Sequence, residues 1–475
     1  MTAIITSKFR TLNAENFKED IDTANSGSSV YVAIGKTDAW SNNTGDTTDT
    51  EPFTPYDTID SLVEARENIF ALKKLNAADV SNVIPRHSWT TGTSYVQWDS
   101  NDPDIFDKAF YVITSEFKVY KCIYSPGTGS TQEPTQTLTA PTAESDGYIW
   151  KYMYTVAVAD AEKFLTTSYM PVKTVNPRAG HTAGQADYSN DAGAETALSE
   201  GDYAQYLNQK ASTNSITAAG IERIVVTAGG TGYTEAPDVF ITGAGNGATA
   251  TAVVSGGSVT AVNVTAKGTD YSTAHIVISG GGSGATGASA RAVLAPENGH
   301  GTDPIKELGG FFSAVNTLLD GTGGGDLTTG NDFRQITLFK NPFNFGTSTI
   351  STEPTLKATP ALSFQSTTSA FQVDELITQG SGATLAQAFV VEVDSGTGYV
   401  YYAQNSKTGY GNFVTGTTVT GATSNAQGTP KANNSDFRID PEVDVHSGDI
   451  VFLENRNPID RTASQIEDIK IIIEF

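Results

Sequence analysis

Hydrophobic and polar residues alternate in many short runs along this chain, and few stretches show the wider spacing of an amphipathic helix. The run Ser29–Ile34 is rich in Val, Tyr and Ile and ends at Gly35, and the run Ile469–Phe475 has the same character. Such residues fit the pleated, half-buried surface of a sheet. The pattern therefore predicts a mainly β protein with a minor α component.

Helical spacing is confined to three segments. The first follows Asp57, a candidate N-cap, and its apolar positions recur at helical intervals through Ile59, Leu62, Val63, Ile69 and Phe70. A second helix is predicted over Ile305–Leu319, although Gly309 and Gly310 weaken it. A shorter helix is predicted over Ala14–Thr23, and Asp187–Asn214 has no pattern that assigns an element.

Residues 216–295 contain a repeat built from Gly, Thr, Ala and Val. Gly230–Tyr233 (GTGY) precedes an apolar run and a glycine cluster, and Gly268–Tyr271 (GTDY) precedes an equivalent run and cluster 38 residues later. Each copy predicts strands separated by tight glycine turns. Two copies are too few for a long solenoid, so we expect one small β domain.

A second stretch of unusual composition covers residues 363–430. Phe389–Val393 and Tyr399–Tyr402 predict hairpin strands joined by Asp394–Gly398. We interpret both stretches as modules inserted into surface loops of one β-sandwich-like core, because the entropy of loop closure grows only slowly with length. The expected organisation is core in 1–215, 297–362 and 436–475, with inserted modules at 216–296 and 363–435.

Composition narrows the classes of function. The 475 residues allow roughly two to four domains. The net charge of −24 disfavours nucleic acid and anionic membranes as partners. Cys122 is the single cysteine, which excludes an intramolecular disulfide and suggests a buried structural thiol. We find neither a secretion signal nor an apolar run of membrane-helix length, and we expect synthesis in the cytoplasm.

Two glycine-containing strings resemble nucleotide-binding motifs. Gly282–Gly287 matches GxGxxG after an apolar run, but alternating small residues follow where a helix should begin. Gly35-Lys36-Thr37 ends like a phosphate-binding loop, yet Val30 stands where the first glycine is needed. Both are interpreted as turns or strand ends.

Candidate metal ligands are similarly weak. The histidines, at positions 87, 181, 275, 300 and 446, lack ligand spacing and are interpreted as turn or surface residues. Asp99–Asp104 resembles part of a calcium loop without its Gly and Glu, so an Asx-stabilised turn is the preferred interpretation. The alternating acids Asp440, Glu442 and Asp444 could hold a cation or meet a basic partner, although a solvated face is preferred.

Catalytic signatures are equally weak. There is no GxSxG string, and nothing singles out two acids for glycan cleavage, although such a pair can form in space. No catalytic, cofactor-binding or metal-binding residue is therefore predicted. Trp89 and Trp150 lie in apolar strings and are expected in the core, with a role as interface anchors as the alternative.

Five ordered strings carry a family resemblance. They are Ala3–Thr11 (AIITSKFRT), Val83–Trp89 (VIPRHSW), Asp146–Tyr152 (DGYIWKY), Asp332–Pro342 (DFRQITLFKNP) and Ser447–Ile459 (SGDIVFLENRNPI). Together they resemble a baseplate wedge subunit of contractile-tailed, T-even-type bacteriophages. The resemblance implies a homodimeric structural protein of the virion that joins other wedge subunits and moves with the baseplate on contraction. It implies no catalysis and no cofactor, and we expect no nucleic acid, membrane insertion or small-molecule substrate among the partners.

Two other classes of function remain open. The glycine- and threonine-rich modules are compatible with a tail adhesin that binds host glycans. A tail hydrolase that degrades host polysaccharide is a third possibility.

Overall fold

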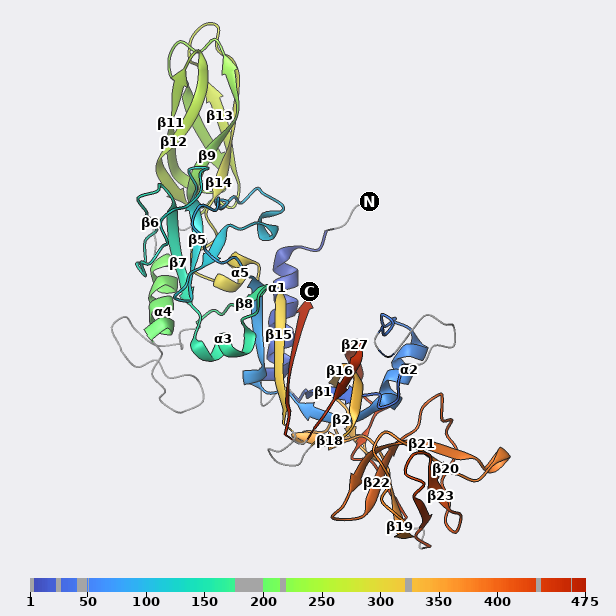
Figure 1. Ribbon diagram of the computed structural model, residues 1–475. Helices are drawn as coiled ribbons and strands as arrows, with labels where there is room; N and C mark the ends of the chain where they lie inside the picture. The colour runs from blue at the N-terminus through green and yellow to red at the C-terminus, as the bar shows by residue number, and fades with distance from the viewer. Residues whose placement is uncertain are drawn as a thin grey trace. The chain divides into compact units, whose positions relative to one another are not determined.

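The computed structural model describes residues 4–22, 27–40, 49, 51–175, 200–213, 219–320, 327–432, 437–462 and 464–475. The described chain is mainly β, as the sequence predicts, and its elements are labelled in Figure 1. The chain divides into two compact units. Unit 1 comprises Met1–Glu15, Ser81–Ala314 and Ile472–Phe475, and unit 2 comprises Asn16–Val80 and Val315–Ile471. The sandwich arrangement of the core remains a prediction.

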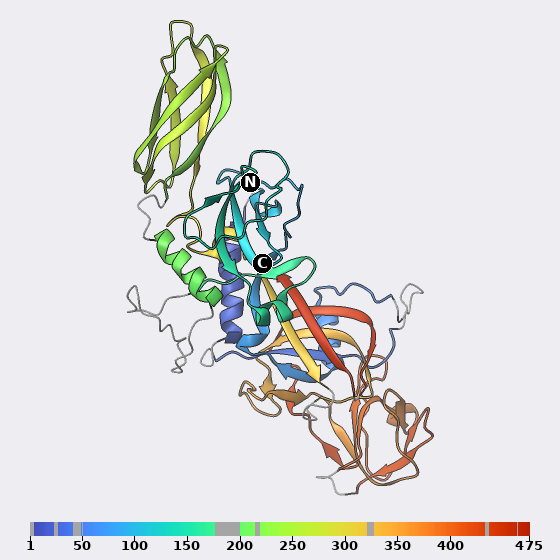
Figure 2. The ribbon, with the colours of Figure 1, turned by 60° about the vertical axis from the view of Figure 1, so that its left-hand side comes forward.

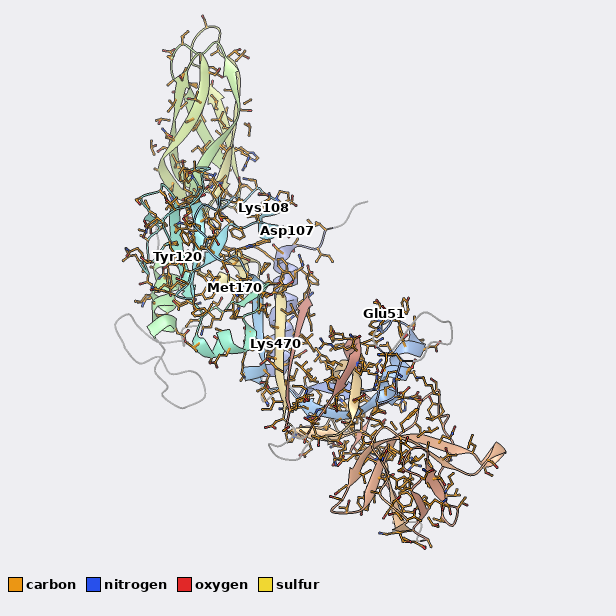
Figure 3. All side chains as sticks on the ribbon, in the orientation of Figure 1. Glu51, Asp107, Lys108, Tyr120, Met170 and Lys470 are labelled. Atoms are coloured by element: carbon orange, nitrogen blue, oxygen red, sulfur yellow. The ribbon has the colours of Figure 1, made fainter. Side chains whose placement is uncertain are left out.

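Unit 1 contains a four-stranded antiparallel sheet in the order β4 (Tyr111–Ile113), β5 (Lys118–Tyr124), β7 (Ile149–Thr155) and β6 (Thr142–Ala143). Strand β3 (Val80–Pro85) pairs with β8 (Tyr169–Pro171) in another sheet, in the order β28 (Ile466–Glu474), β15 (Phe312–Asp320), β3, β8. Of β15 only the first three residues belong to unit 1, and of β28 only the last three. Aromatic and aliphatic side chains fill the core between these elements. Tyr120 and Met170, labelled in Figure 3, are almost completely buried.

Short helices complete unit 1. They are the first half of α1 (Ser7–Asp22), α3 (Val158–Phe164), α4 (Glu200–Thr213), α5 (Pro304–Leu308) and the 3-10 turn η2 (Ile105–Asp107). Helix α4 lies in the segment that the sequence left unassigned; the rest of that segment falls outside the described residues.

The six strands of residues 221–294 form one sheet, which we call the repeat module. Its order is β10 (Asp238–Gly243), β13 (Ala274–Ser279), β14 (Thr286–Leu294), β9 (Ile221–Thr231), β12 (Ser258–Thr269) and β11 (Asn246–Ser255). Strand β10 also lies against β11, so the sheet curls nearly closed, as Figure 2 shows.

The two copies of the repeat exchange partners within this sheet. Strand β9 of the first copy pairs with β14 of the second, β12 of the second pairs with β11 of the first, and β10 pairs with its equivalent β13. Tyr233 and Tyr271 are both buried, and their hydroxyls accept from the main-chain N–H groups of Ala288 and Ala248, respectively. The sequence repeat is thus a structural repeat in which neither copy forms a sheet alone.

Unit 2 contains a five-stranded antiparallel sheet in the order β18 (Thr355–Lys357), β2 (Ile69–Lys74), β1 (Val30–Gly35), β16 (Asp332–Lys340) and β27 (Asp449–Asp460). The strings Asp332–Pro342 and Ser447–Ile459 form most of the neighbouring strands β16 and β27. Strands β17 (Phe343–Asn344) and β26 (Val443–Asp444) form a two-stranded sheet.

The second sheet of unit 2 is a closed ring. It follows the order β22 (Tyr399–Ala403), β21 (Ala386–Asp394), β20 (Leu376–Gln379), β23 (Val419–Gly421), β24 (Gln427–Pro430), β19 (Ala361–Thr367) and β25 (Arg438–Ile439). Strand β22 also pairs with β19, which closes the ring. The predicted hairpin at Asp394–Gly398 joins β21 and β22.

The predicted helix at Ile305–Leu319 is wrong beyond its first turn. Helix α5 starts at Pro304 after the N-cap Asp303 and ends at Gly309, whose φ of 81° places it in the left-handed region. Residues from Phe312 onward form strand β15 instead. Glycine at a helix C-terminus accepts this conformation without a Cβ clash, so the glycine pair terminates the helix instead of weakening it.

The other two predicted helices exist with different bounds. Helix α2 covers Ile59–Asn68 and is capped by Thr58, whose side chain accepts from the N–H of Ser61. Ile69 and Phe70 begin strand β2, where both are buried, so their helical spacing was coincidental. Helix α1 starts at Ser7, seven residues before the predicted Ala14.

Candidate functional site

The loop after Tyr95 joins the repeat module to the sheet of unit 1. The indole of Trp98 donates to the carbonyl of Leu294 at 3.1 Å, and the amide of Asn101 donates to the carbonyl of Ala292 at 2.7 Å. The Ser100 hydroxyl accepts from the N–H of Leu294 at 2.9 Å. Neighbouring side chains of one loop therefore bind the main chain at the C-terminal end of strand β14.

Asp99 of the same loop adds ion pairs to this contact between the loop and the repeat module. Its two carboxylate oxygens accept from Arg291 of β14 at 2.8 and 2.5 Å, and Arg223 of β9 lies 3.5 Å away. Burial opposes ionisation of Asp99, but the hydrogen bond from Arg291 and one from the N–H of Asn101 hold its pKa below the ordinary value. A bidentate Arg–carboxylate pair fixes direction as well as distance.

The predicted Asx turns of Asp99–Asp104 are present. Asp99 accepts from the N–H of Asn101, and Asp102 accepts from the N–H of Asp104. The segment is not a calcium loop in this structure, because its carboxylates pair with Arg291 and with Lys108. Sequence reasoning identified the turn but missed its role as an anchor.

A fully buried ion pair lies behind this loop. Lys121 of β5 donates to Glu307 of α5 at 2.9 Å, and the ammonium lies 3.9 Å from the centre of the Trp98 ring. Neither side chain is more than 5% exposed. Glu307 also accepts from the N–H groups of Gly301 and Asp303, so its carboxylate receives three donors in all. Burial lowers the pKa of Lys121, while Glu307 opposes that shift.

Lys151 of β7 is a second buried lysine near this pair. It is 2% exposed, and its ammonium donates to the side-chain carbonyl of Asn208 of α4. Burial lowers the pKa of Lys151 to about 8, although the charge of Glu307 partly opposes this. Among the described residues, no carboxylate lies within ion-pair distance of this ammonium.

Lys151 lines a cavity of about 370 Å³ between the repeat module, α4 and the loop before β6. Across the cavity lies Glu222 of β9, which accepts from Lys267 of β12 at 2.9 Å through both oxygens. Burial would raise the pKa of Glu222, but His300 and Lys267 hold it at about 2. The hydroxyl of Ser212 of α4 donates to the carbonyl of His300 at 2.6 Å.

His300 lies in a turn, as expected, but its side chain is buried. Its side chain is 8% exposed and its Nε2 lies 3.5 Å from Glu222. Burial and the nearby Lys121 lower the pKa of His300, so the ring is neutral near pH 7. His275 is exposed and His87 is half-buried, while His181 lies outside the described residues.

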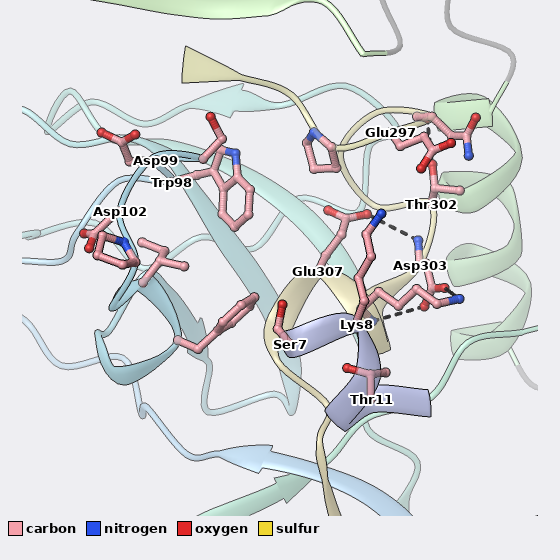
Figure 4. A pocket seen from close by; sticks show the side chains of 17 residues that line it. Ser7, Lys8, Thr11, Trp98, Asp99, Asp102, Glu297, Thr302, Asp303 and Glu307 are labelled. Carbon is pink, nitrogen blue, oxygen red and sulfur yellow. Dashed lines mark hydrogen bonds and ion pairs between the residues drawn. The ribbon is translucent and has the colours of Figure 1, made fainter. Parts of the chain in front are cut away.

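An open cleft of about 700 Å³ lies on the same unit. Ser7, Lys8 and Thr11 of α1 form one wall, and Trp98 and Asp99 lie opposite (Figure 4). Its remaining lining comes from η2, α5 and the loops around them, including four further acids. The cleft combines apolar surface with charged rims, which suits contact with another protein better than a buried reaction centre.

The N-terminal segment beside this cleft carries exposed apolar side chains. Ile4 and Ile5 are 86% and 69% exposed, and Phe9 and Leu12 are about half exposed. Phe9 and Leu12 are three positions apart in α1, so they lie on the same side of the helix. Exposed apolar side chains grouped in this way are typical of protein interaction surfaces.

The remaining sequence candidates behave as structural residues. Gly282–Gly287 connects β13 to β14, with a strand and not a helix following it. Gly35 ends β1, where an added Cβ would lie 2.6 Å from the carbonyl oxygen of Asn68. Lys36 follows it and pairs with Asp38 in a buried position.

The acidic and sulfur-containing candidates are also accounted for. Glu442 accepts from the N–H of Lys357 and Asp444 from the N–H of His446. Within the described ranges, Asp440 and these two acids form no cluster that could hold a metal ion. Cys122 is fully buried, and burial raises the pKa of its thiol, as expected of a structural cysteine.

The expected core tryptophan Trp150 is 2% exposed and stacks on Tyr148, and Trp89 packs half-buried against the same cluster. Their role as interface anchors remains a prediction. No helix in the described part of the chain has the length and apolar character needed to cross a membrane.

Comparison with known proteins supports the resemblance seen in the five strings. A family model described as Phage-Gp8 (Bacteriophage T4, Gp8) matches residues 3–139. The chain is also similar to the baseplate wedge protein gp8 of Enterobacteria phage T4, with 24% identity over 202 residues. That alignment covers 36% of this chain and 60% of the relative, so the similarity spans less than two thirds of that protein. The predicted resemblance to a T4-type baseplate wedge subunit is confirmed.

Proposed function

We propose that this chain is a structural subunit of the baseplate wedge in a contractile phage tail. The observation that carries the proposal is the similarity of residues 3–139 to the Gp8 family, together with the wedge protein of phage T4 as a relative. The chain would be made in the host cytoplasm and built into the virion. It would join neighbouring wedge subunits through preformed surfaces and shift with them on contraction.

The architecture is compatible with a role in assembly. Several charged groups of the described interior pair with one another, as Lys121 does with Glu307 and Arg334 with Asp49. The exposed apolar side chains near the N-terminus lie within the segment that matches the family. A protein that binds other proteins in this way needs no catalytic group, and we propose that the chain is not an enzyme.

The wedge assignment is tested by locating the chain in a tail. Electron microscopy of intact tails should place density for this chain in the baseplate, in contact with other wedge proteins. Mass spectrometry of purified tails should recover it in a fixed ratio to the other wedge proteins. Its absence from purified tails would disprove the assignment.

The homodimer is tested separately. Light scattering on the purified chain at micromolar concentration should give a mass near twice the 50.0 kDa of one chain. A stable monomer under these conditions would contradict the dimer without affecting the wedge assignment.

The insertions at 216–296 and 363–435 remain part of the proposal, and they also distinguish it from the adhesin alternative. Phage carrying a chain that lacks the outer part of the repeat module should adsorb to host cells at the normal rate, provided the baseplates assemble. Intact baseplates with reduced adsorption would favour an adhesin. Incubation of the purified chain with host envelope polysaccharide should release no sugar, and release would favour a hydrolase.

A further inference from the structure

The cavity lined by Lys151 has an excess of positive charge in an otherwise acidic chain. The ammonium groups of Lys151 and Lys267 line it together with one carboxylate, that of Glu222. The charges of Glu307 and Lys121 act on Lys151 from outside the lining, and these two residues pair with each other. Each carboxylate is taken by one lysine, at 2.9 Å in both cases. His300 is the remaining titratable group, and it is neutral near pH 7. One ammonium, that of Lys151, is therefore left over.

The position of Lys151 makes this imbalance costly. Removing an ammonium from water without a counter-charge costs several kcal/mol, so buried lysines are normally paired or deprotonated. Among the described residues, this ammonium donates to one acceptor, the neutral side-chain carbonyl of Asn208, which satisfies one of its three donors. Among the described residues, the nearby acids are already engaged with Lys121 and Lys267.

The cavity itself has room for a counter-ion. Its volume of about 370 Å³ exceeds the share of roughly 30 Å³ that one water molecule occupies in the liquid. It is bounded by small side chains at Ala140, Ala211 and Ala295, which leave the space open beside the charged groups. An oxyanion in this space would accept hydrogen bonds from the free donors of Lys151 at low dielectric, where such bonds are strong.

We propose that this cavity is a binding site for a small oxyanion, such as phosphate, with Lys151 as its charged contact. The bound anion would supply the counter-charge that the chain itself does not provide. The repeat module contributes Glu222 and Lys267, α4 contributes Ala211 and Ser212, and β7 contributes Lys151, so the anion would also link these three elements. The proposal does not depend on the function proposed above.

Inorganic phosphate is the probe for the test. Calorimetric titration of the full chain at pH 7, in chloride buffer of constant ionic strength, should show saturable binding of phosphate. Phosphate should also raise the melting temperature, since a ligand that binds only the folded state stabilises it. The Lys151→Gln variant should bind at least about tenfold more weakly, the factor expected for one charge-assisted hydrogen bond.

Two further variants serve as a control for the loss of a lysine and as a second test of the cavity. Lys306→Gln removes an exposed lysine that does not line the cavity, and it should bind phosphate like the wild type. Ala140→Phe fills the cavity from an exposed loop position and leaves every charge in place, so it should abolish binding even if Lys151→Gln does not fold. The proposal is overturned if the wild type shows no saturable binding, or if Ala140→Phe binds phosphate as well as the wild type.

Discussion

At the scale of single residues, the buried pair Lys121–Glu307 predicts a large effect of one substitution on the stability of unit 1. Replacing Glu307 by Gln leaves the ammonium of Lys121 buried without a counter-charge, and we expect a loss of about 3 kcal/mol in the free energy of unfolding. Urea denaturation followed by tryptophan fluorescence measures this, because Trp98 contacts the ammonium.

The control for Glu307→Gln is Glu297→Gln, which removes an exposed carboxylate from the preceding loop and should change stability by less than about 0.5 kcal/mol. The double variant Lys121→Met with Glu307→Gln should recover part of the loss, since the unpaired charge is gone. Equal losses in the two Glu→Gln variants would refute this account.

Asp374 in unit 2 predicts a pH dependence of stability. Burial raises its pKa from 3.8 to about 7, with the N–H of Asp332 as a hydrogen-bond donor that only partly offsets the effect. Between about pH 4 and pH 7 the unfolded chain has lost this proton while the folded chain keeps it. Stability therefore falls as pH rises through this range, by about 1–2 kcal/mol once partial exposure is allowed for.

The Asp374→Asn variant isolates this effect. Asn keeps the acceptor for the N–H of Asp332 and tolerates the φ of 64° found at this position. It should be more stable than the wild type at pH 8 and equally stable at pH 4, as measured by denaturation at both pH values. A variant that is less stable at pH 8 would contradict the assigned cause.

At the scale of secondary structure elements, Gly309 decides where a helix stops and a strand begins. Its φ is 81°, and an added Cβ would lie 2.7 Å from the ring of Phe106. Gly309→Ala should therefore lose roughly 1–2 kcal/mol from backbone strain and more from the ring contact. Gly92 is a matched control, because its φ is 82° but an added Cβ meets no atom within 4 Å. Thermal unfolding should rank Gly309→Ala as the less stable variant, and equal stability would exclude the ring contact as a cause.

At the scale of the whole chain, the outer part of the repeat module can be deleted without removing its contacts with Asp99. Val226 and Ala290 are cross-strand partners in β9 and β14, so a two-residue Asn-Gly turn can replace residues 227–289. The trimmed chain keeps Arg223, Arg291 and the buried Val293. The two arginines contact Asp99, and Val293 packs in the core of unit 1.

We expect the trimmed chain to fold, because most members of the hydrophobic cluster around Tyr233 and Tyr271 lie in the strands that are removed. Circular dichroism should show retained β structure, and size-exclusion chromatography should show a compact particle. Aggregation of the trimmed chain would instead indicate that the outer strands are needed by the core, which would contradict their interpretation as an insertion.

The sequence by itself determined the class of the fold, the strands at Ser29–Ile34 and Ile469–Phe475, the repeat between Gly230 and Gly284, and the likeness to wedge subunits. These features are local: alternation, turn residues and ordered strings are visible within a few neighbouring positions. The helix at Ile305–Leu319 failed for the opposite reason, since only the tertiary setting shows Gly309 in the left-handed region and Phe312 entering a sheet.

Only the tertiary structure placed the charged groups of the interior. In the sequence, Lys121 precedes Cys122 and Lys151 precedes Tyr152, each within a run of apolar and aromatic strand residues. A charged residue inside such a run was the one sign in the sequence that these lysines are buried. Their neighbours Asn208, Glu222, His300 and Glu307 come from distant parts of the chain. Electrostatic contacts depend on separation in space and on burial, and neither quantity is encoded in the spacing of residues along the sequence.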